Sequence, residues 1–154
     1  MKKILITGCL GHIGSYLLEN KNFNKHKIVG LDNLLTQRYC SLFNLKRNKK
    51  NIQFIYSDIL EKNFIKYVKD VDILIHLAAI TDAESSVNKK KEVDIVNFKS
   101  FKKIVGYCSK FNTKIIFAST TSVYGTQKDF VDEECEDSDL KPQSPYAQSK
   151  LDSE

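Results

Sequence analysis

Three regularly spaced glycines that follow a short apolar run near the N-terminus constrain this chain most strongly. Ile4-Leu5-Ile6 has the continuous apolar character of a buried parallel strand. The glycines come next, and the apolar residues after them have helical spacing. The glycines are Gly8, Gly11 and Gly14, and the apolar residues with helical spacing are Ile13, Leu17 and Leu18.

A strand, a glycine turn and a helix in this order predict a cradle for phosphate. The first glycine permits the tight turn, the second lets the backbone approach a pyrophosphate, and the third lets the helix pack closely on the strand. The start of the helix then offers free N–H groups and the positive end of its dipole to the anion. The spacing is Gly-x-x-Gly-x-x-Gly rather than the commoner Gly-x-Gly-x-x-Gly, so an ordinary turn is the alternative at this point.

The composition is that of one globular domain with an ordinary core, since 42% of the 154 residues are hydrophobic and 28% are charged. The net charge of +5 is spread over scattered lysines. No aromatic residues interleave the longest run, Lys89-Lys90-Lys91. Charge of this kind is typical of solvated helix faces and loops, and it argues against a nucleic-acid partner.

The cysteines and histidines have no spacing typical of a metal site or a disulfide framework. The first apolar run ends at Thr7-Gly8, which is too short for a signal peptide, and no stretch is long enough to cross a membrane. We therefore expect free thiols, no bound metal, no membrane partner and a cytoplasmic location. The cysteines are Cys9, Cys40, Cys108 and Cys135, and the histidines are His12, His26 and His76.

Apolar runs alternate with helical patterns along the rest of the chain, which predicts an α/β fold with a doubly wound parallel sheet and no domain boundary inside it. The expected strands are residues 4–6, 27–32, 52–56, 71–79 and 114–119. The expected helices are residues 61–68, residues 86–111 and a short exposed helix within 33–50, and an acidic exposed loop is expected at 129–139. In the longest helix the residues expected to face inward are Val93, Val96, Ile104 and Val105.

Two carboxylates follow the second and third expected strands. Asp32 lies 18 residues after Gly14, where folds of this kind place an acid that binds the adenosine ribose hydroxyls. A carboxylate there would repel a 2′-phosphate, so it favours NAD over NADP. The alternative for Asp32 is a strand-end residue that caps the next turn, and the alternative for Asp58 is a cap of the following helix.

Hydroxyl groups follow the fifth expected strand, at the carboxyl edge where open α/β sheets bind ligands. These residues are Thr120, Thr121 and Ser122. Farther along, Tyr146 and Lys150 are four residues apart and therefore lie on one face of a helix, which Pro145 suits as its first residue. The alternative is a half-buried tyrosine beside a solvated lysine.

Taken together, these features resemble the extended short-chain dehydrogenase/reductase family, and within it the nucleotide-sugar epimerases and dehydratases. The matches run in register along the whole chain. They are Thr7-Gly8-x-x-Gly11-x-x-Gly14, Asp32-Asn33-Leu34, Asp58-Ile59, His76-Leu77-Ala78-Ala79, Asn97, Ser119 to Gly125 with its ending Val-Tyr-Gly, and Ser144-Pro-Tyr-Ala-Gln-Ser-Lys150.

The resemblance implies a Rossmann-type sheet with strand order 3-2-1-4-5 and NAD as the cofactor. The glycines would hold the pyrophosphate, Asp32 the adenosine ribose, and Asp58 with Ile59 the adenine. The full set of cofactor-binding residues that it implies is Gly8, Gly11, His12, Ile13, Gly14, Asp32, Asn33, Asp58, Ile59, Leu77, Ala78, Ala79, Tyr146 and Lys150.

The catalytic residues that the resemblance implies are Thr120, Tyr146, Lys150 and Asn97. Tyr146 would be the general base, Lys150 would bind the nicotinamide ribose, Thr120 would hydrogen-bond the reacting oxygen, and Asn97 would support the site. Hydride transfer from an alcohol needs such a base, and tyrosine, with an ordinary pKa of about 10, serves at neutral pH only where cations favour its phenolate.

The reaction favoured by the residues is epimerisation at sugar C4 through a transient 4-keto intermediate. Dehydratases of the family have an Asp-Glu pair between the catalytic threonine and Val-Tyr-Gly, and decarboxylases commonly keep a Glu there. Here the two positions are Thr121 and Ser122. A dehydratase, decarboxylase or reductase of the same family remains an alternative, and a noncatalytic dinucleotide-binding regulator is an alternative of another class.

The sequence departs from the family pattern in two places. Ser100 stands where the family often has a glycine, three residues after Asn97. Family members also continue past the position of Glu154 into a smaller substrate-binding domain. We therefore expect residues 1–154 to be an incomplete NAD-binding domain that is inactive alone, with a nucleotide-sugar substrate and a homodimer as the assembly of the full-length protein.

Overall fold

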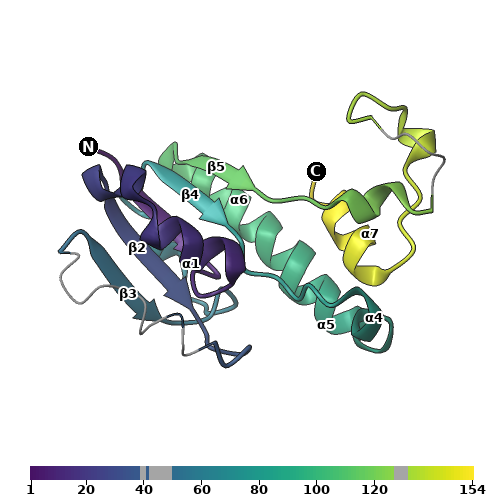
Figure 1. The fold of residues 1–154 in the computed structure, drawn as a ribbon, viewed down its shortest axis with the longest axis horizontal. Coiled ribbons are helices and arrows are strands. Elements are labelled where there is room, and N and C mark those ends of the chain that lie inside the picture. Colours follow the sequence, from purple (N-terminus) through teal and green to yellow (C-terminus); the bar gives the residue numbers. More distant parts are fainter. Residues whose placement is uncertain (39–40, 42–49, 127–131) are drawn as a thin grey trace. The chain divides into compact units, whose positions relative to one another are not determined.

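The computed structural model describes residues 1–38, 41, 50–126 and 132–154 (Figure 1). The chain forms two compact units. The first contains residues 1–78 and 103–118, and the second contains residues 79–102 and 119–154.

The first unit is built on one five-stranded parallel sheet with the order β3-β2-β1-β4-β5. This order is the predicted one. The strands are β1 (Lys3–Thr7), β2 (Lys27–Asp32), β3 (Ile52–Tyr56), β4 (Ile73–His76) and β5 (Lys114–Phe117). Strands β2 and β3 have the predicted bounds, whereas β4 begins later than expected and both β4 and β5 end earlier. After β4 the amide of Leu77 still bonds to the carbonyl of Thr7, and the chain then leaves the sheet at Ala78.

Strand β1 lies in the middle of the sheet and is buried on both faces, which explains why its sequence is continuously apolar. Leu5 and Ile6 are 0% exposed. The glycine turn contributes to the same core through Cys9, whose sulfur fills the space in front of Gly30 of β2. The buried residues of this cluster are Ile4, Ile6, Cys9, Leu10, Leu18, Ile28 and Ile75.

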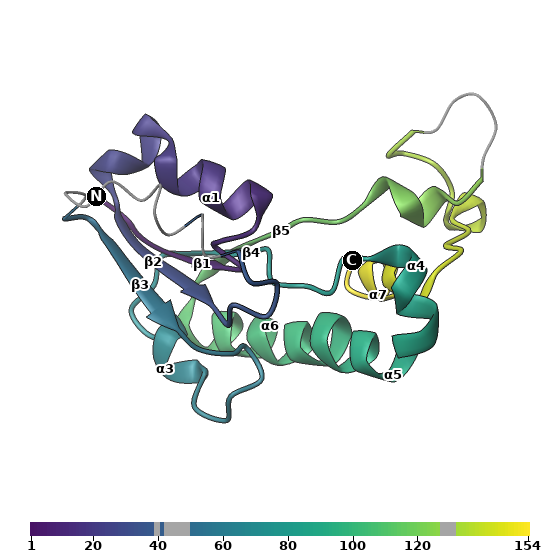
Figure 2. The same cartoon turned by 60° about the horizontal axis from the view of Figure 1, so that its bottom comes forward.

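Helices cover both faces of the sheet in the first unit. Figure 2 shows α1 (His12–Glu19) on one face, and α3 (Ile65–Val68) with α6 (Ser100–Phe111) on the other. A 3-10 helix, η1 (Lys21–Lys25), follows α1. These layers make the predicted doubly wound arrangement. None of the helices in the described ranges is long and apolar enough to span a bilayer.

One predicted helix of the first unit is shorter than expected, and another lies largely outside the described residues. The helix expected at 61–68 is shorter, because α3 begins only at Ile65. The preceding residues are held in turns by Asp58, whose carboxylate accepts from the amide of Leu60 and whose own amide donates to Glu61. Local bonds of this kind compete with helix formation. The short helix expected within 33–50 falls largely on residues 39–40 and 42–49, outside the described residues.

The second unit consists of helical segments and their connections. Along the chain these are α4 (Ala83–Ser86), the 3-10 helix η2 (Val87–Lys89), α5 (Lys90–Val93), the π-helix η3 (Asp94–Lys99), the start of α6, the 3-10 helices η4 (Thr121–Tyr124) and η5 (Asp137–Asp139), and α7 (Pro145–Leu151). Of the acidic loop expected at 129–139, the described part is exposed apart from half-buried Cys135 and contains η5.

The helix predicted at 86–111 is therefore a succession of helical types rather than one α-helix. Val93 and Ile104 are buried as expected and Val96 is half-buried, but Val105 is 40% exposed. The prediction for Val105 was wrong, because the buried positions of this segment recur every three or four residues, at Val93, Asn97, Ser100, Phe101, Ile104 and Cys108, and Val105 lies off that stripe.

Candidate active site

The glycine turn between β1 and α1 has the close backbone contacts that its sequence predicts. Gly8 has φ +68°, and a Cβ on it would lie 2.7 Å from the amide nitrogen of Ala78. A Cβ on Gly14 would lie 2.6 Å from the carbonyl oxygen of Gly8, so the helix packs on the turn itself. At Gly11 the nearest atom would be 3.3 Å away. Packing therefore requires glycine at the first and third positions, whereas the contact at the second position is less close.

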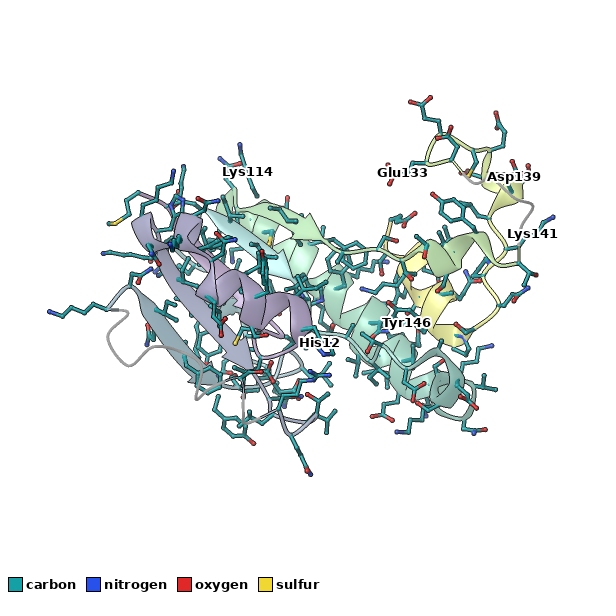
Figure 3. All side chains as sticks on the ribbon, in the orientation of Figure 1. His12, Lys114, Glu133, Asp139, Lys141 and Tyr146 are labelled. Atoms are coloured by element: carbon teal, nitrogen blue, oxygen red, sulfur yellow. The ribbon has the colours of Figure 1, made fainter. Side chains whose placement is uncertain are left out.

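The start of α1 provides the amides that a phosphate needs. Gly11 is the N-cap and brings no side-chain cap, so the first amides of the helix remain available for an anion. His12 lies at this end of the helix (Figure 3) and is exposed, as is Ile13 with 58% of its surface. Ile13 therefore does not contribute to the core as its helical spacing suggests, and it lies instead beside the amides that face solvent.

Asp32 ties the glycine turn to the carboxyl end of β2. One carboxylate oxygen accepts from the amide of Leu10 at 3.0 Å, and the other accepts from the amide of Leu34 at 2.9 Å. The bond to Leu34 is the turn cap that the sequence left as an alternative. A carboxylate offers about four acceptor sites, so Asp32 can still accept from hydroxyl groups.

The thiol of Cys9 is protonated and inert in this setting. Burial, together with the nearby charge of Asp32, raises its pKa to about 12. Cys9, Cys108 and Cys135 are free thiols, and Cys40 lies outside the described residues.

Asp58 is held by Asn33 at the carboxyl end of β3. The side-chain amide of Asn33 donates to Asp58 Oδ2 at 2.8 Å, and the amide of Leu60 donates to Asp58 Oδ1 at 2.8 Å. The neighbouring Ile59 is buried, and Asp58 is half-buried. Ser57 is buried as well, and within the described part of the chain its hydroxyl has no hydrogen-bond partner. The fold thus brings Asn33, Asp58 and Ile59 together at the carboxyl end of β3.

The end of β4 completes the group of predicted residues in the first unit. His76 is 1% exposed, its Nδ1 lies 2.8 Å from Thr7 Oγ1, and its ring stacks on Phe117. Leu77 is half-buried, and the amide of Ala78 lies 3.5 Å from the same threonine oxygen. Ala79, the last residue of this motif, is half-buried and belongs to the second unit.

The second unit contains the predicted catalytic side chains. Ser144 caps α7 by accepting from the amide of Ala147, and Pro145 is the first helical residue, as predicted. Tyr146 lies in the first turn of α7 (Figure 3). Lys150 lies one turn later with its Nζ 6.0 Å from the centre of the Tyr146 ring. The two side chains share one face, as their spacing predicts.

Thr120 and Asn97 belong to the same unit. The hydroxyl of Thr120 accepts from the amide of Ser122 and caps η4, which packs against α7. Asn97 is 3% exposed, bonds to both main-chain polar groups of Ile80, and donates to the hydroxyl of Ser149 at 3.1 Å. Thr121 and Ser122 are exposed. Asn97 therefore reaches α7 through Ser149.

Two serines of this unit were not singled out by the sequence. Ser149 lies between Tyr146 and Lys150, and its position three residues after Tyr146 is a local signal for a bond to the Tyr146 carbonyl. Ser86 accepts from the amide of Tyr146, 60 residues away, and no local pattern indicates this contact. Ser100, where the family often has glycine, is buried and bonds to the carbonyl of Val96.

Burial of Lys150 should make the protein more stable as the pH rises from about 8 to 10.5. The side chain is 5% exposed, and burial lowers its pKa from 10.5 to about 8. Within this window the unfolded chain keeps the Lys150 proton and the folded chain has lost it, so the free energy of unfolding increases with pH. The destabilisation is complete below pH 8 and absent above pH 10.5.

Urea unfolding at pH 7, 8, 9 and 10.5 would measure this effect. Lys150→Met is expected to be more stable than the wild type at pH 7 and to lose that advantage as the pH rises. Lys103→Met alters an exposed lysine of α6 and is expected to follow the wild type. A Lys150→Met curve parallel to the wild type would contradict the prediction.

Comparison with known proteins agrees with this geometry. The chain is 34% identical to an uncharacterized UDP-glucose epimerase, YtcB, from Bacillus subtilis over 97% of the chain and 48% of that protein. It is 35% identical to a mouse dTDP-D-glucose 4,6-dehydratase over 97% of the chain and 43% of that protein. The chain thus spans about half the length of the curated relatives that it matches.

A solved structure shares the fold. The UDP-glucuronic acid 4-epimerase from Bacillus cereus, in complex with NAD, is 30% identical and superimposes with a TM-score of 0.85 over 98% of this chain and 50% of that one. The model of a protein family described as the NAD dependent epimerase/dehydratase family matches residues 4–154. The chain therefore belongs to the NAD-dependent epimerase/dehydratase family, whose members act with NAD.

Proposed function

We propose that this chain carries the dinucleotide site and catalytic residues of a nucleotide-sugar epimerase that acts at sugar C4. The observation that carries the proposal is the pair Thr121 and Ser122, which occupies the positions where related dehydratases have acidic residues. Loss of water from a sugar needs one group to protonate the leaving hydroxyl and another to remove a ring proton. A hydroxyl side chain does neither near neutral pH without a dedicated partner. Epimerisation through a 4-keto sugar needs no such pair.

The residues of the first unit fit NAD. The cradle of Gly8 and Gly14 excludes side chains, the start of α1 offers amides, and Asp32 has acceptor sites left for ribose hydroxyls. A 2′-phosphate at that carboxylate would be repelled, which favours NAD over NADP. When bound, NAD supplies the acceptor for the C4 hydride and returns the hydride to the keto sugar.

The residues of the second unit supply the proton chemistry. Tyr146 accepts the proton of the C4 hydroxyl as the carbon is oxidised and returns it when the carbon is reduced. Burial lowers the pKa of Lys150 to about 8, so its side chain is positively charged below that pH, and its Nζ lies 6.0 Å from the centre of the Tyr146 ring. Thr120 hydrogen-bonds the C4 oxygen and positions it for transfer. The sugar turns over between the two half-reactions, so its C4 configuration inverts without net oxidation.

The proposal predicts the products formed from UDP- and dTDP-hexoses. Incubation of the full-length protein with each sugar, followed by NMR of the products, should reveal interconversion of C4 epimers without net formation of NADH. A 4-keto-6-deoxy product would assign a dehydratase, and stoichiometric use of added NADH would assign a reductase. Binding of NAD with no product from any sugar would favour the noncatalytic regulator. Each of these three outcomes contradicts the proposal.

A further inference from the structure

Three buried polar side chains of the second unit are linked to the main chain of Tyr146, two of them directly and Asn97 through Ser149. Ser86, Asn97 and Ser149 are 0%, 3% and 4% exposed. They come from α4, η3 and α7 respectively. Burial of a hydroxyl or an amide is unfavourable unless it is hydrogen-bonded, so the partners of these groups explain why the polar side chains are tolerated.

Ser86 holds the amide side of Tyr146. Its hydroxyl oxygen accepts from the Tyr146 N–H at 3.3 Å, and its hydroxyl donates to the carbonyl of Ala83 at 2.6 Å. The Tyr146 amide lies in the first turn of α7, where amides have no partner within the helix. A side chain from α4 therefore fixes the start of the catalytic helix.

Ser149 holds the carbonyl group of Tyr146. Its hydroxyl donates to the Tyr146 carbonyl at 2.7 Å and accepts from Asn97 Nδ2 at 3.1 Å. Asn97 is itself fixed, because it accepts from the amide of Ile80 at 2.9 Å and donates to the carbonyl of Ile80 at 3.0 Å. A chain of three bonds thus runs from the segment after β4 to the main chain of Tyr146. Such connected buried networks are rigid when every member is satisfied.

We propose that Ser86 and Ser149 are positioning residues that hold the Tyr146 main chain from both sides, with Asn97 anchoring Ser149. The proposal rests on the proposed function, because it takes Tyr146 as the proton acceptor. The hydroxyls fix the direction in which the tyrosine leaves α7, and with it the distance from the phenol to Lys150 and to the reacting oxygen. A displacement of about 1 Å in such a group lowers catalysis by up to about 100-fold.

The test compares Ser86→Ala and Ser149→Ala with Ser100→Ala in the full-length protein. Ser100 is the matched control, because it is equally buried and its hydroxyl also bonds to a helix carbonyl, that of Val96. Amide hydrogen exchange over residues 144–151 is expected to be faster in both test variants and unchanged in the control. In turnover, kcat is expected to fall about tenfold or more in both test variants with KM unchanged. Ser149→Thr keeps the hydroxyl and is expected to restore part of kcat.

Hydrogen exchange and kcat together distinguish failure of this inference from failure of the proposed function. Unchanged exchange over residues 144–151 in both test variants would overturn the inference whatever the reaction is. Faster exchange together with a kcat equal to that of Ser100→Ala would also overturn the inference, because the two serines would then serve only folding. A Tyr146→Phe variant with normal kcat would overturn the proposed function instead, and the exchange result would still report whether the two serines hold α7. If one alanine variant does not fold, the other still tests the inference, because Ser86 bonds to the amide of Tyr146 and Ser149 bonds to its carbonyl.

Discussion

Replacing Tyr146 with phenylalanine is expected to abolish turnover in the full-length protein while NAD still binds. The change removes one hydroxyl and leaves the ring, the α7 backbone and its bonds to Ser86 and Ser149 in place. Because that hydroxyl is the proposed proton acceptor, kcat should fall by about 10²–10⁴-fold. Steady-state assays of C4 interconversion would measure the loss, and calorimetric titration would measure the NAD affinity.

Tyr107→Phe is the matched control for this experiment. Tyr107 is a half-buried helical tyrosine of α6, as Tyr146 is of α7, and the proposal gives it no chemical role. Its variant should keep the wild-type kcat. A Tyr146→Phe enzyme with kcat near that of Tyr107→Phe would exclude Tyr146 as the base. A variant that lost NAD affinity together with kcat would show that the hydroxyl serves binding.

Continuous apolar runs made the sheet predictable, because a parallel strand covered on both faces leaves a signal that needs no distant partner. Strand β2 and strand β3 have the bounds read from the sequence. The end of β4 was missed for a physical reason. Leu77 still bonds to Thr7, and Ala78 and Ala79 stay apolar although the chain has left the sheet, with the backbone at Ala78 packed against Gly8. An apolar residue indicates burial, but it does not indicate whether a neighbouring strand or another segment covers it.

The helical half of the chain was less predictable than the sheet. The π-helical turn at 94–99 follows from nothing in its local sequence. The same turn carries Asn97, a residue of the candidate site, and π-helical turns occur frequently at functional sites. The bond from Ser86 to Tyr146 is likewise non-local, since 60 residues separate the partners. Motifs therefore predicted the candidate catalytic side chains, whereas the groups that bond to their main chain became visible only in the fold.

Alanine substitutions at four glycines should separate the folding role of the glycine turn from its binding role. Gly8→Ala places a side chain at φ +68° and 2.7 Å from the Ala78 backbone, and Gly14→Ala places one 2.6 Å from the Gly8 carbonyl. The left-handed conformation alone costs about 1–2 kcal/mol, and forced overpacking costs about 1–3 kcal/mol. Both costs apply to Gly8→Ala, which should lose at least about 2 kcal/mol of unfolding free energy, whereas only the overpacking cost applies to Gly14→Ala, which should lose about 1–3 kcal/mol.

Gly106→Ala is the control, and it is expected to raise the free energy of unfolding rather than lower it. Gly106 lies within α6 and an added Cβ would meet nothing within 4 Å, so this variant should gain about 0.5–1 kcal/mol.

Gly11→Ala tests the binding role of the turn. Its φ of −64° suits alanine and its closest contact would be 3.3 Å, so the loss of unfolding free energy should be smaller than that of Gly8→Ala or Gly14→Ala. NAD affinity should nevertheless fall, because a methyl group at the second glycine blocks the approach of the backbone to a pyrophosphate. Urea unfolding and calorimetric titration of all four variants would measure the two effects independently. If Gly11→Ala bound NAD as tightly as Gly106→Ala, the turn would be structural only, and the pyrophosphate would have to bind elsewhere.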